Sequence, residues 1–284
     1  MAFTSYDDII ASFAAGKGQE RYFHKVAAAA QVASAAYSFW GVGSAPVAGS
    51  FVGGTTPGLW VAQDYSTTGA LAFDNPTGPD TLHLSIVSAV PSAAAGTLLV
   101  YDRLGQIEYL PLQDGSLPET TAITSDFTAR LGSGEGAQLF AELPAAVLGA
   151  GAQFYVTYTN QAGTGGRTSE TIVCSTISSA ATGRFPYANK FFIGLQAGDT
   201  GVRSVESVVL TASSATTSVK MNLVACKPLA LLPITTANVF VERDLILATA
   251  QLPRIRDDAC IAFALLSSST GTPNVNGRLV AVAG

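Results

Sequence analysis

The second half of this sequence repeats a pattern of residues found in its first half. The pattern reads Leu143-Pro144, Phe154, Gly163 and Arg167 in one copy, and Leu252-Pro253, Phe263, Gly271 and Arg278 in the other. A second match lies upstream: Ser85, Val87, Leu110 and Pro111 correspond to Ser207, Val209, Leu232 and Pro233. Matched residues are separated by more positions in the upstream match than in the downstream match. The first copy therefore carries an extra stretch within 113–142. The repeat predicts two similar modules in tandem, over residues 46–180 and 181–284.

From Gly41 onward, the residue pattern is typical of β structure. Gly, Pro, Ser and Thr separate short runs rich in Val, Tyr, Phe and Thr. Strands are predicted at 97–101, 107–110, 154–158, 171–174, 205–211, 219–225, 239–241, 260–266 and 279–281. Each copy therefore offers enough strands for a small β-sandwich or a jelly roll. The pattern does not distinguish these two topologies.

The first 45 residues are expected to form an α-helical N-terminal arm. Ser5, followed three residues later by Asp8, resembles a capping box, and Ile9, Ile10 and Phe13 then fall on one side of a helix. A second helix is predicted over 19–36, where small residues recur at helical spacing. The arm could dock on its own β body or on a neighbouring subunit. The expected fold is thus mostly β, with two tandem sandwich-like or jelly-roll-like modules after a short helical arm.

The composition favours a subunit of an assembly. Charged residues make up 12% of the chain, hydrophobic residues 48%, and the mean hydropathy is +0.34. A surface with so little charge is poorly protected against self-association and gains from being covered by a partner. No continuous apolar run is long enough to cross a membrane, so no membrane contact is expected.

Nucleic acid is not an expected partner. The net charge is −5 and the Lys and Arg residues are scattered, whereas binding to a phosphate backbone needs clustered cations. The densest group is Arg243, Arg254 and Arg256. Acidic residues lie between and beside them, which predicts ion pairs at a surface or interface.

The sequence gives no pattern for a catalytic, metal or cofactor site. Cys174, Cys226 and Cys260 lack the spacing of a zinc site and lie in apolar runs, which predicts small buried hydrophobic residues in a reducing compartment. His83 has Asp80, Ser85 and Ser88 nearby, but no Gly-x-Ser-x-Gly motif is present, so an ordinary strand histidine is favoured. We expect no enzyme activity, no metal and no cofactor.

Two glycine-rich loops mark the repeated hairpin. They span residues 160–167 in the first copy and 269–278 in the second. Glycine supplies the positive φ that a tight hairpin needs. The arginine at the end of each loop, Arg167 or Arg278, is expected to form a structural pair across the hairpin.

Several segments resemble a family of tailed-bacteriophage and prophage proteins that are regarded as virion structural components. They are Tyr-Thr-Asn-Gln-Ala-Gly-Thr-Gly-Gly-Arg-Thr at 158–168, Gly-Leu-Gln-Ala-Gly-Asp-Thr-Gly-Val-Arg-Ser-Val at 194–205, Leu-Val-Tyr-Asp-Arg-Leu at 99–104, and Phe-Thr-Ser-Tyr-Asp-Asp at 3–8 before Gly-Lys-Gly. These are turn and strand signatures, so no functional residue is carried over. The resemblance covers most of the chain.

The resemblance, together with the repeat and the low charge, implies a capsid decoration or cement protein. The expected partner is the major capsid protein, the expected state is a homo-oligomer, either a dimer or a trimer, and the expected location is the capsid surface after synthesis in the cytoplasm of a bacterial host. A tail, fibre or adaptor component of the virion is the alternative. The residues expected to make the assembly contact are Phe3, Tyr6, Ile9, Ile10 and Phe13.

Overall fold

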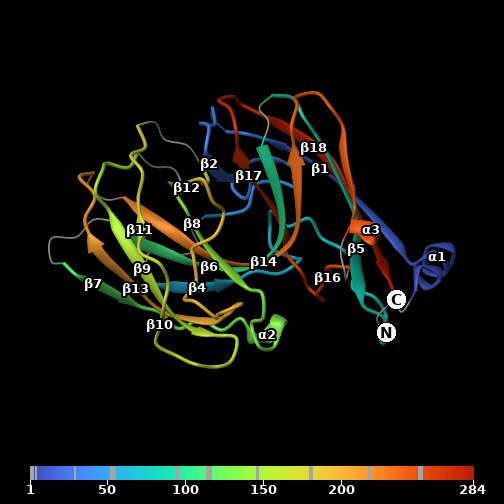
Figure 1. The fold of residues 1–284 in the computed structure, drawn as a ribbon, viewed down its shortest axis with the longest axis horizontal. Helices are drawn as coiled ribbons and strands as arrows, with labels where there is room; N and C mark the ends of the chain where they lie inside the picture. The colour runs from blue at the N-terminus through green and yellow to red at the C-terminus, as the bar shows by residue number, and fades with distance from the viewer. Residues whose placement is uncertain are drawn as a thin grey trace.

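A computed structural model of the chain contains three antiparallel β-sheets and short helices (Figure 1). It describes residues 3, 5–28, 30–51, 56–93, 96–112, 117–144, 147–178, 182–216, 219–248 and 252–284. The expectation of a mostly β protein with a short N-terminal helix is confirmed. The helices are α1 (Tyr6–Ala14), α2 (Thr128–Leu131) and α3 (Leu245–Ala248).

One sheet contains both the first and the last strand, and we call it the terminal sheet. Its order is β15 (Val241–Asp244), β5 (Leu82–Pro91), β18 (Asn274–Ala283), β1 (Gly18–Val26) and β3 (Ser44–Ala45), with β16 (Arg254–Ile255) also on β5. In Figure 1 this sheet lies at the end of the molecule that carries α1.

The central sheet lies between the other two sheets (Figure 1). Its order is β12 (Arg184–Ala188), β2 (Ala35–Ser38), β17 (Ile261–Ser267), β6 (Gly96–Pro111), β14 (Lys220–Ile234) and β8 (Gln138–Glu142), with β4 (Leu59–Ala62) also on β6. The segments 97–101 and 107–110, predicted as separate strands, are parts of the single long strand β6.

The third sheet lies at the opposite end, and we call it the distal sheet. Its order is β10 (Arg167–Thr168), β9 (Gln153–Asn160), β13 (Val202–Ala212) and β7 (Glu119–Ala122), with β11 (Ile172–Val173) also on β9. The extra stretch expected in the first copy includes β7, α2 and β8. The part of that stretch at 113–116 lies outside the described residues.

Two hydrophobic cores form on the two sides of the central sheet. One core joins the central and distal sheets and includes Tyr101 and Phe154. The other joins the central and terminal sheets, where the rings of Phe23 and Phe263 stack with centroids 4.1 Å apart. Within β6, Leu98 and Val100 belong to the second core while Leu99 and Tyr101 belong to the first. This alternation follows from the two-residue period of a strand.

The sheets do not follow the expected division into 1–45, 46–180 and 181–284. The terminal sheet pairs β1 from the first range, β5 from the second and β18 from the third, and the central sheet also mixes the three ranges. The physical reason is that β6 and β14 are long and pair with each other from one end to the other. The boundary after residue 180 falls among residues outside the described part of the chain.

The upstream sequence match nevertheless has a structural counterpart. In each copy a strand of an outer sheet leads into a long central strand: β5 into β6, and β13 into β14. The matched dipeptides Leu110-Pro111 and Leu232-Pro233 lie at opposite ends of the antiparallel β6–β14 pair. The long strands of the two copies, β6 and β14, therefore run in opposite directions in the shared central sheet.

The hairpin predicted at 269–278 is wrong, whereas the one at 160–167 forms between β9 and β10. After β17 the chain leaves the central sheet and enters the terminal sheet as β18. Gly277 and Arg278 lie inside β18 and not at a turn. Gly277 permits a close approach, because a Cβ atom there would lie 2.2 Å from the carbonyl oxygen of Ser88.

The helix predicted over 19–36 is also wrong. The described residues of this segment include β1 and the start of β2, and β1 pairs with β18 along its whole length, from Gly18 opposite Val282 to Val26 opposite Asn274. Phe23 and Lys25 point inward while Tyr22 and His24 point outward. Small side chains at helical spacing bury little area, so the backbone bonds to β18 decide the conformation.

A buried polar cluster surrounds Arg103 on β6. The Arg103 side chain is fully buried, donates to a Glu142 carboxylate oxygen at 2.5 Å and to the side-chain oxygens of Gln63 and Gln106 at 2.6 Å each, and lies 4.7 Å from the Trp40 ring centroid. Glu142 is also fully buried. A buried charge without its partner carries a large desolvation cost, so the pair must be retained or replaced together.

We predict that Arg103→Met lowers the free energy of unfolding by about 3–5 kcal/mol, because Glu142 is left buried and unpaired. Urea unfolding followed by tryptophan fluorescence measures this loss. The matched control is the double variant Arg103→Met with Glu142→Met, which should recover much of the stability. A single variant as stable as the wild type would contradict the prediction.

Candidate functional site

The N-terminal helix α1 is fixed by the capping box that the sequence predicts. The Ser5 hydroxyl accepts a hydrogen bond from the Asp8 amide at 3.2 Å, and the Ser5 amide donates to the Asp8 carboxylate at 3.0 Å. The helix ends at Ala14, and Gly16 follows with a φ of 74°. These local bonds define both ends of the helix before any tertiary contact is made.

The structure separates the five expected contact residues into two groups. Ile9 is buried against the body, and the Phe3 ring lies edge-on to the His83 ring with centroids 5.4 Å apart. Tyr6, Ile10 and Phe13 are 59%, 64% and 36% exposed. Their spacing places them on one face of the helix, where Tyr6 and Ile10 are largely exposed and the Phe13 ring partly covers Gly18 at the start of β1. We call these three residues the α1 stripe.

The α1 stripe is held in place by contacts just after the helix. Lys17 forms an ion pair with Asp80 at 2.6 Å, and its carbonyl oxygen accepts a hydrogen bond from the Ala283 amide at 3.1 Å. Helix α1 therefore projects from the terminal sheet at a fixed position (Figure 1). An apolar stripe on a projecting, anchored helix is suited to a protein contact.

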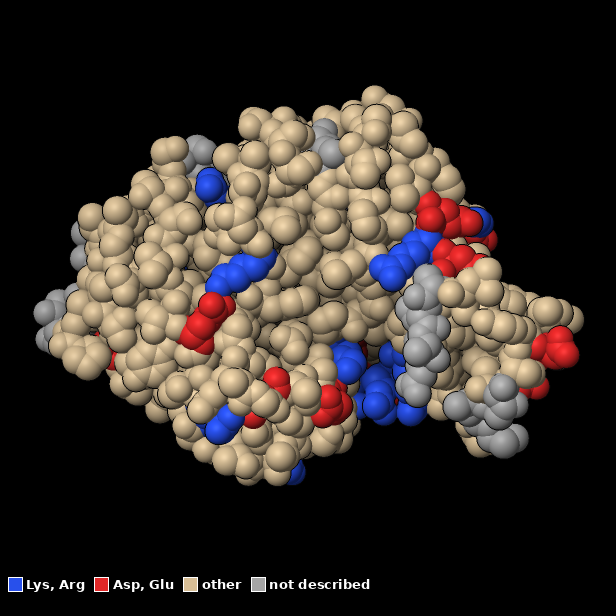
Figure 2. Space-filling model, in the orientation of Figure 1, with Lys and Arg blue, Asp and Glu red and all other residues tan. Residues whose placement is uncertain are grey.

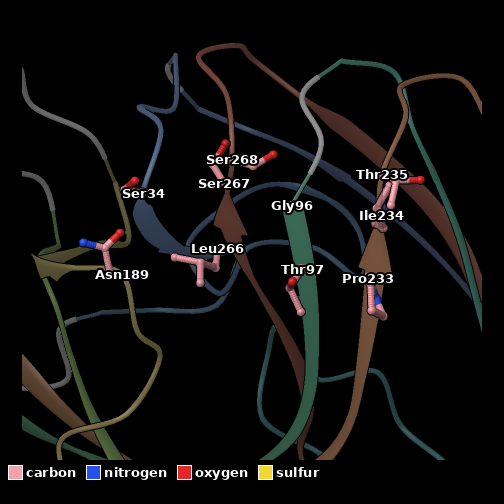
Figure 3. Close-up of a pocket in the computed structure, with 10 residues that line it drawn as sticks. All are labelled: Ser34, Gly96, Thr97, Asn189, Pro233, Ile234, Thr235, Leu266, Ser267 and Ser268. Atoms are coloured by element: carbon pink, nitrogen blue, oxygen red, sulfur yellow. The ribbon is translucent and has the colours of Figure 1, made fainter.

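A second surface feature is a groove of about 540 Å³ where the strands of the central sheet end (Figure 3). Leu266, Thr97 and Pro233 are neighbours across β17, β6 and β14. Ser34 and Asn189 lie beside Leu266 (Figure 3), and both have left-handed backbone angles, with φ of 66° and 64°. The lining residues carry no charge. The groove can form hydrogen bonds, but it offers no acid or base.

Charged side chains are sparse on the face shown in Figure 2, as the composition predicts. Lys and Arg side chains gather mainly in the region of β16 and α2 (Figure 2). The expected ion pairs of the densest cationic group are not found: among the described side chains, Arg243, Arg254 and Arg256 have no ion pair, and Arg243 donates to the Leu231 carbonyl oxygen at 2.7 Å.

The segments at 158–168 and 194–205 meet around one carboxylate, that of Asp199. It accepts hydrogen bonds from the Tyr158 hydroxyl and the Asn160 amide at 2.7 Å each, and it pairs with Arg167 through two bonds at 2.9 and 3.2 Å. Arg167 thus has the expected structural role, but its partner is not across the hairpin. Arg278 pairs with Glu20 on the adjacent strand.

Sequence reasoning did not identify Asp199 as the centre of these contacts. Tyr158 and Asn160 are two residues apart on β9 and so share a face, which is the signal that polar groups converge there. The Arg167 guanidinium and these two donors hold the pKa of the Asp199 carboxyl at about 2. The resemblance segments therefore carry a structural role, the locking of a loop onto the distal sheet.

The residues considered for nucleophilic catalysis are not brought together. His83 lies in β5 as a strand histidine, with Nε2 2.8 Å from the Thr81 hydroxyl and Nδ1 3.3 Å from the Leu252 carbonyl oxygen. Ser85 donates to the Val280 carbonyl oxygen at 2.9 Å, and Asp80 pairs with Lys17. Burial lowers the pKa of His83.

The three cysteines are buried and free, which confirms the interpretation of them as small core residues. Burial raises the pKa of the Cys174 and Cys260 thiols to about 12. Within the described ranges, no group of three or more His, Cys, Asp or Glu side chains could hold a metal ion. None of the described helices has the length and apolar character to span a membrane.

No protein-family model and no curated protein matches the chain. Solved structures of infectious bursal disease virus give distant structural matches. The Gt strain structure is 11% identical with a TM-score of 0.18, over 94% of this chain and 80% of that chain. The VP2 subviral particle is 8% identical with a TM-score of 0.20, over 94% and 81%. Scores this low do not show a shared fold.

We predict that Asp199→Asn destabilises the protein at neutral pH and that the effect disappears in acid. A carboxyl group whose pKa is lower in the folded state than its ordinary value of 3.8 stabilises the fold above that value, and the stabilisation is lost as the pH falls toward 2. Unfolding midpoints measured from pH ~7 to ~2 should converge for the variant and the wild type.

The control for this prediction is Asp7→Asn, because Asp7 is exposed on α1. Its unfolding midpoint should follow that of the wild type across the same pH range. An Asp199→Asn protein that unfolds like the wild type at neutral pH would show that the carboxylate does not hold the two segments together.

Proposed function

We propose that this chain is a virion structural protein of a tailed phage, and that it decorates and stabilises the capsid by binding the major capsid protein. The observation that carries the proposal is the α1 stripe, an apolar face on a projecting helix of an otherwise β-rich body. The likeness of the segments at 99–104, 158–168 and 194–205 to phage virion proteins supports the same proposal.

The α1 stripe is the proposed capsid contact. Large apolar side chains that are exposed together on one helix face are costly in water and lose that cost when a partner covers them. Asp7 and Asp8 are exposed in the first turn of the same helix. The proposed contact is therefore an apolar groove on the capsid whose rim accepts acidic groups.

The rest of the molecule suits a part that is repeated over a shell. Two cores share one central sheet, so the body is braced on both sides of that sheet. A lattice that holds many copies turns modest individual contacts into lasting attachment. Dimers or trimers of the chain at symmetry axes of the shell belong to the same proposal. The free buried cysteines fit synthesis in the reducing cytoplasm of a host.

We predict that the triple variant Tyr6→Ser, Ile10→Ser and Phe13→Ser folds normally but loses binding to capsids. Tyr6 and Ile10 are largely exposed and Phe13 contacts the body only through its ring over Gly18, so we expect the β body to stay folded while the apolar area available to a partner is removed. Co-sedimentation with capsids that lack this protein measures the binding. Helix α1 is kept in this test, so its capping box and its buried Ile9 are not disturbed.

The matched control replaces exposed apolar residues elsewhere, as Val173→Ser with Leu247→Ser. Val173 and Leu247 are 62% and 74% exposed, and neither belongs to the α1 stripe. This control should bind like the wild type. Wild-type binding by the triple variant would refute the assignment of the α1 stripe.

The copy number of the protein in purified virions tests the function as a whole. Quantitative mass spectrometry against the major capsid protein should give a count in simple proportion to that protein. A small count would favour a tail, fibre or adaptor component instead. Complete absence from virions would overturn the proposal.

A further inference from the structure

The outer face of the terminal sheet carries a groove of about 390 Å³, separate from the α1 stripe and from the groove of Figure 3. We call it the aromatic groove, because Tyr22 and Phe240 line it. Tyr22 is 67% exposed and Phe240 is 59% exposed. Two exposed rings that line one groove form a contiguous apolar patch, and such patches mark interaction sites.

The strand register places polar groups between these rings on the same face. Tyr22 on β1 lies opposite Arg278 on β18, and Arg278 lies opposite Ser88 on β5. In the next row His24 lies opposite Asn276. Residues directly opposite each other in antiparallel strands point to the same side of a sheet. The guanidinium, imidazole, amide and hydroxyl groups therefore share the outer face with the two rings.

Ser88 has a feature that the packing of the sheet does not explain. Its side chain is fully buried, and its hydroxyl has no hydrogen-bond partner among the described residues. A nearby serine on the same strand, Ser85, donates to the Val280 carbonyl oxygen at 2.9 Å. An unpaired buried hydroxyl is unfavourable. Ser88 lines the aromatic groove, so a ligand there can provide the missing partner.

The charges around the groove disfavour an anionic ligand. Arg278 is the cation that lines it, and its guanidinium is already paired with Glu20 at 2.7 Å and with Glu242 at 3.2 Å. A phosphate or carboxylate would meet two carboxylates and no free positive charge. A purely apolar side chain is equally unsuited, because it would leave the Ser88 hydroxyl unpaired.

We propose that the aromatic groove binds a neutral saccharide. The C–H faces of a sugar ring pack on Tyr22 and Phe240, and its hydroxyl groups bond to Ser88, Asn276 and the outward N–H groups of Arg278. Binding sites of this type combine apolar aromatic walls with a few polar groups that fix the orientation of the ligand. Ser88 is fully buried between Arg278 and Glu242 on the neighbouring strands, so in this proposal the ligand reaches its hydroxyl by displacing the Glu242 side chain, while Arg278 keeps its ion pair with Glu20. This activity is separate from capsid binding.

The test is isothermal titration of the full chain with neutral oligosaccharides of glucose, galactose, mannose and N-acetylglucosamine. We expect at least one of them to bind, and we expect Tyr22→Ala and Phe240→Ala each to weaken that binding about tenfold or more. Tyr65→Ala is the control, because Tyr65 is 46% exposed and does not line the groove. It should bind like the wild type.

A second variant separates a binding role of Ser88 from a structural one. Ser88→Ala removes an unpaired hydroxyl, so the unfolding midpoint should stay the same or rise while saccharide binding falls. A hydroxyl with a purely structural role would give the opposite change in stability. The proposal is overturned if no saccharide in the panel binds, or if binding survives both aromatic substitutions. Neither outcome bears on capsid binding, because no capsid is present.

Discussion

The antiparallel pairing of β6 with β14 is the constraint on which the rest of the structure depends. The register runs from Pro111 opposite Lys220 to Gly96 opposite Ile234, so the two strands stay together along their lengths. Each strand contributes side chains to both hydrophobic cores. The distal and terminal sheets are thus packed on one shared support, and a change in this pair affects both cores at once.

A buried ion pair joins β6 to β8, the strand on the other side of β14. Arg103 on β6 and Glu142 on β8 are fully buried, although charged residues are rare in the sequence as a whole. Gln63 and Gln106 accept further hydrogen bonds from Nε and Nη2 of the guanidinium. Such a cluster tolerates only those neighbours that supply its hydrogen bonds. We infer that it fixes the position of the segment that carries Trp40 over the central sheet.

The two proposed contact surfaces rest on opposite kinds of support. The α1 stripe depends mainly on a local feature, the Ser5 capping box, and the Lys17–Asp80 ion pair then anchors the end of the helix to the body. The aromatic groove depends on register, because β1, β18 and β5 must align for Tyr22, Arg278 and Ser88 to share one face. The α1 stripe and the aromatic groove lie on α1 and on the terminal sheet. The distal sheet carries neither surface and packs against the central sheet.

The sequence by itself determined the features that depend on near neighbours: helix α1 with its cap, strands such as β9, β13 and β17, and the burial of the cysteines. Tertiary structure alone decided which strands pair, because backbone hydrogen bonds in a sheet join residues far apart in the chain. That is why 19–26 forms a strand against β18, and why the tandem repeat builds one shared central sheet. Asp199 and Ser88 matter for the same reason. Residues that are distant in the sequence lie beside them in the fold, and no local pattern predicts those neighbours.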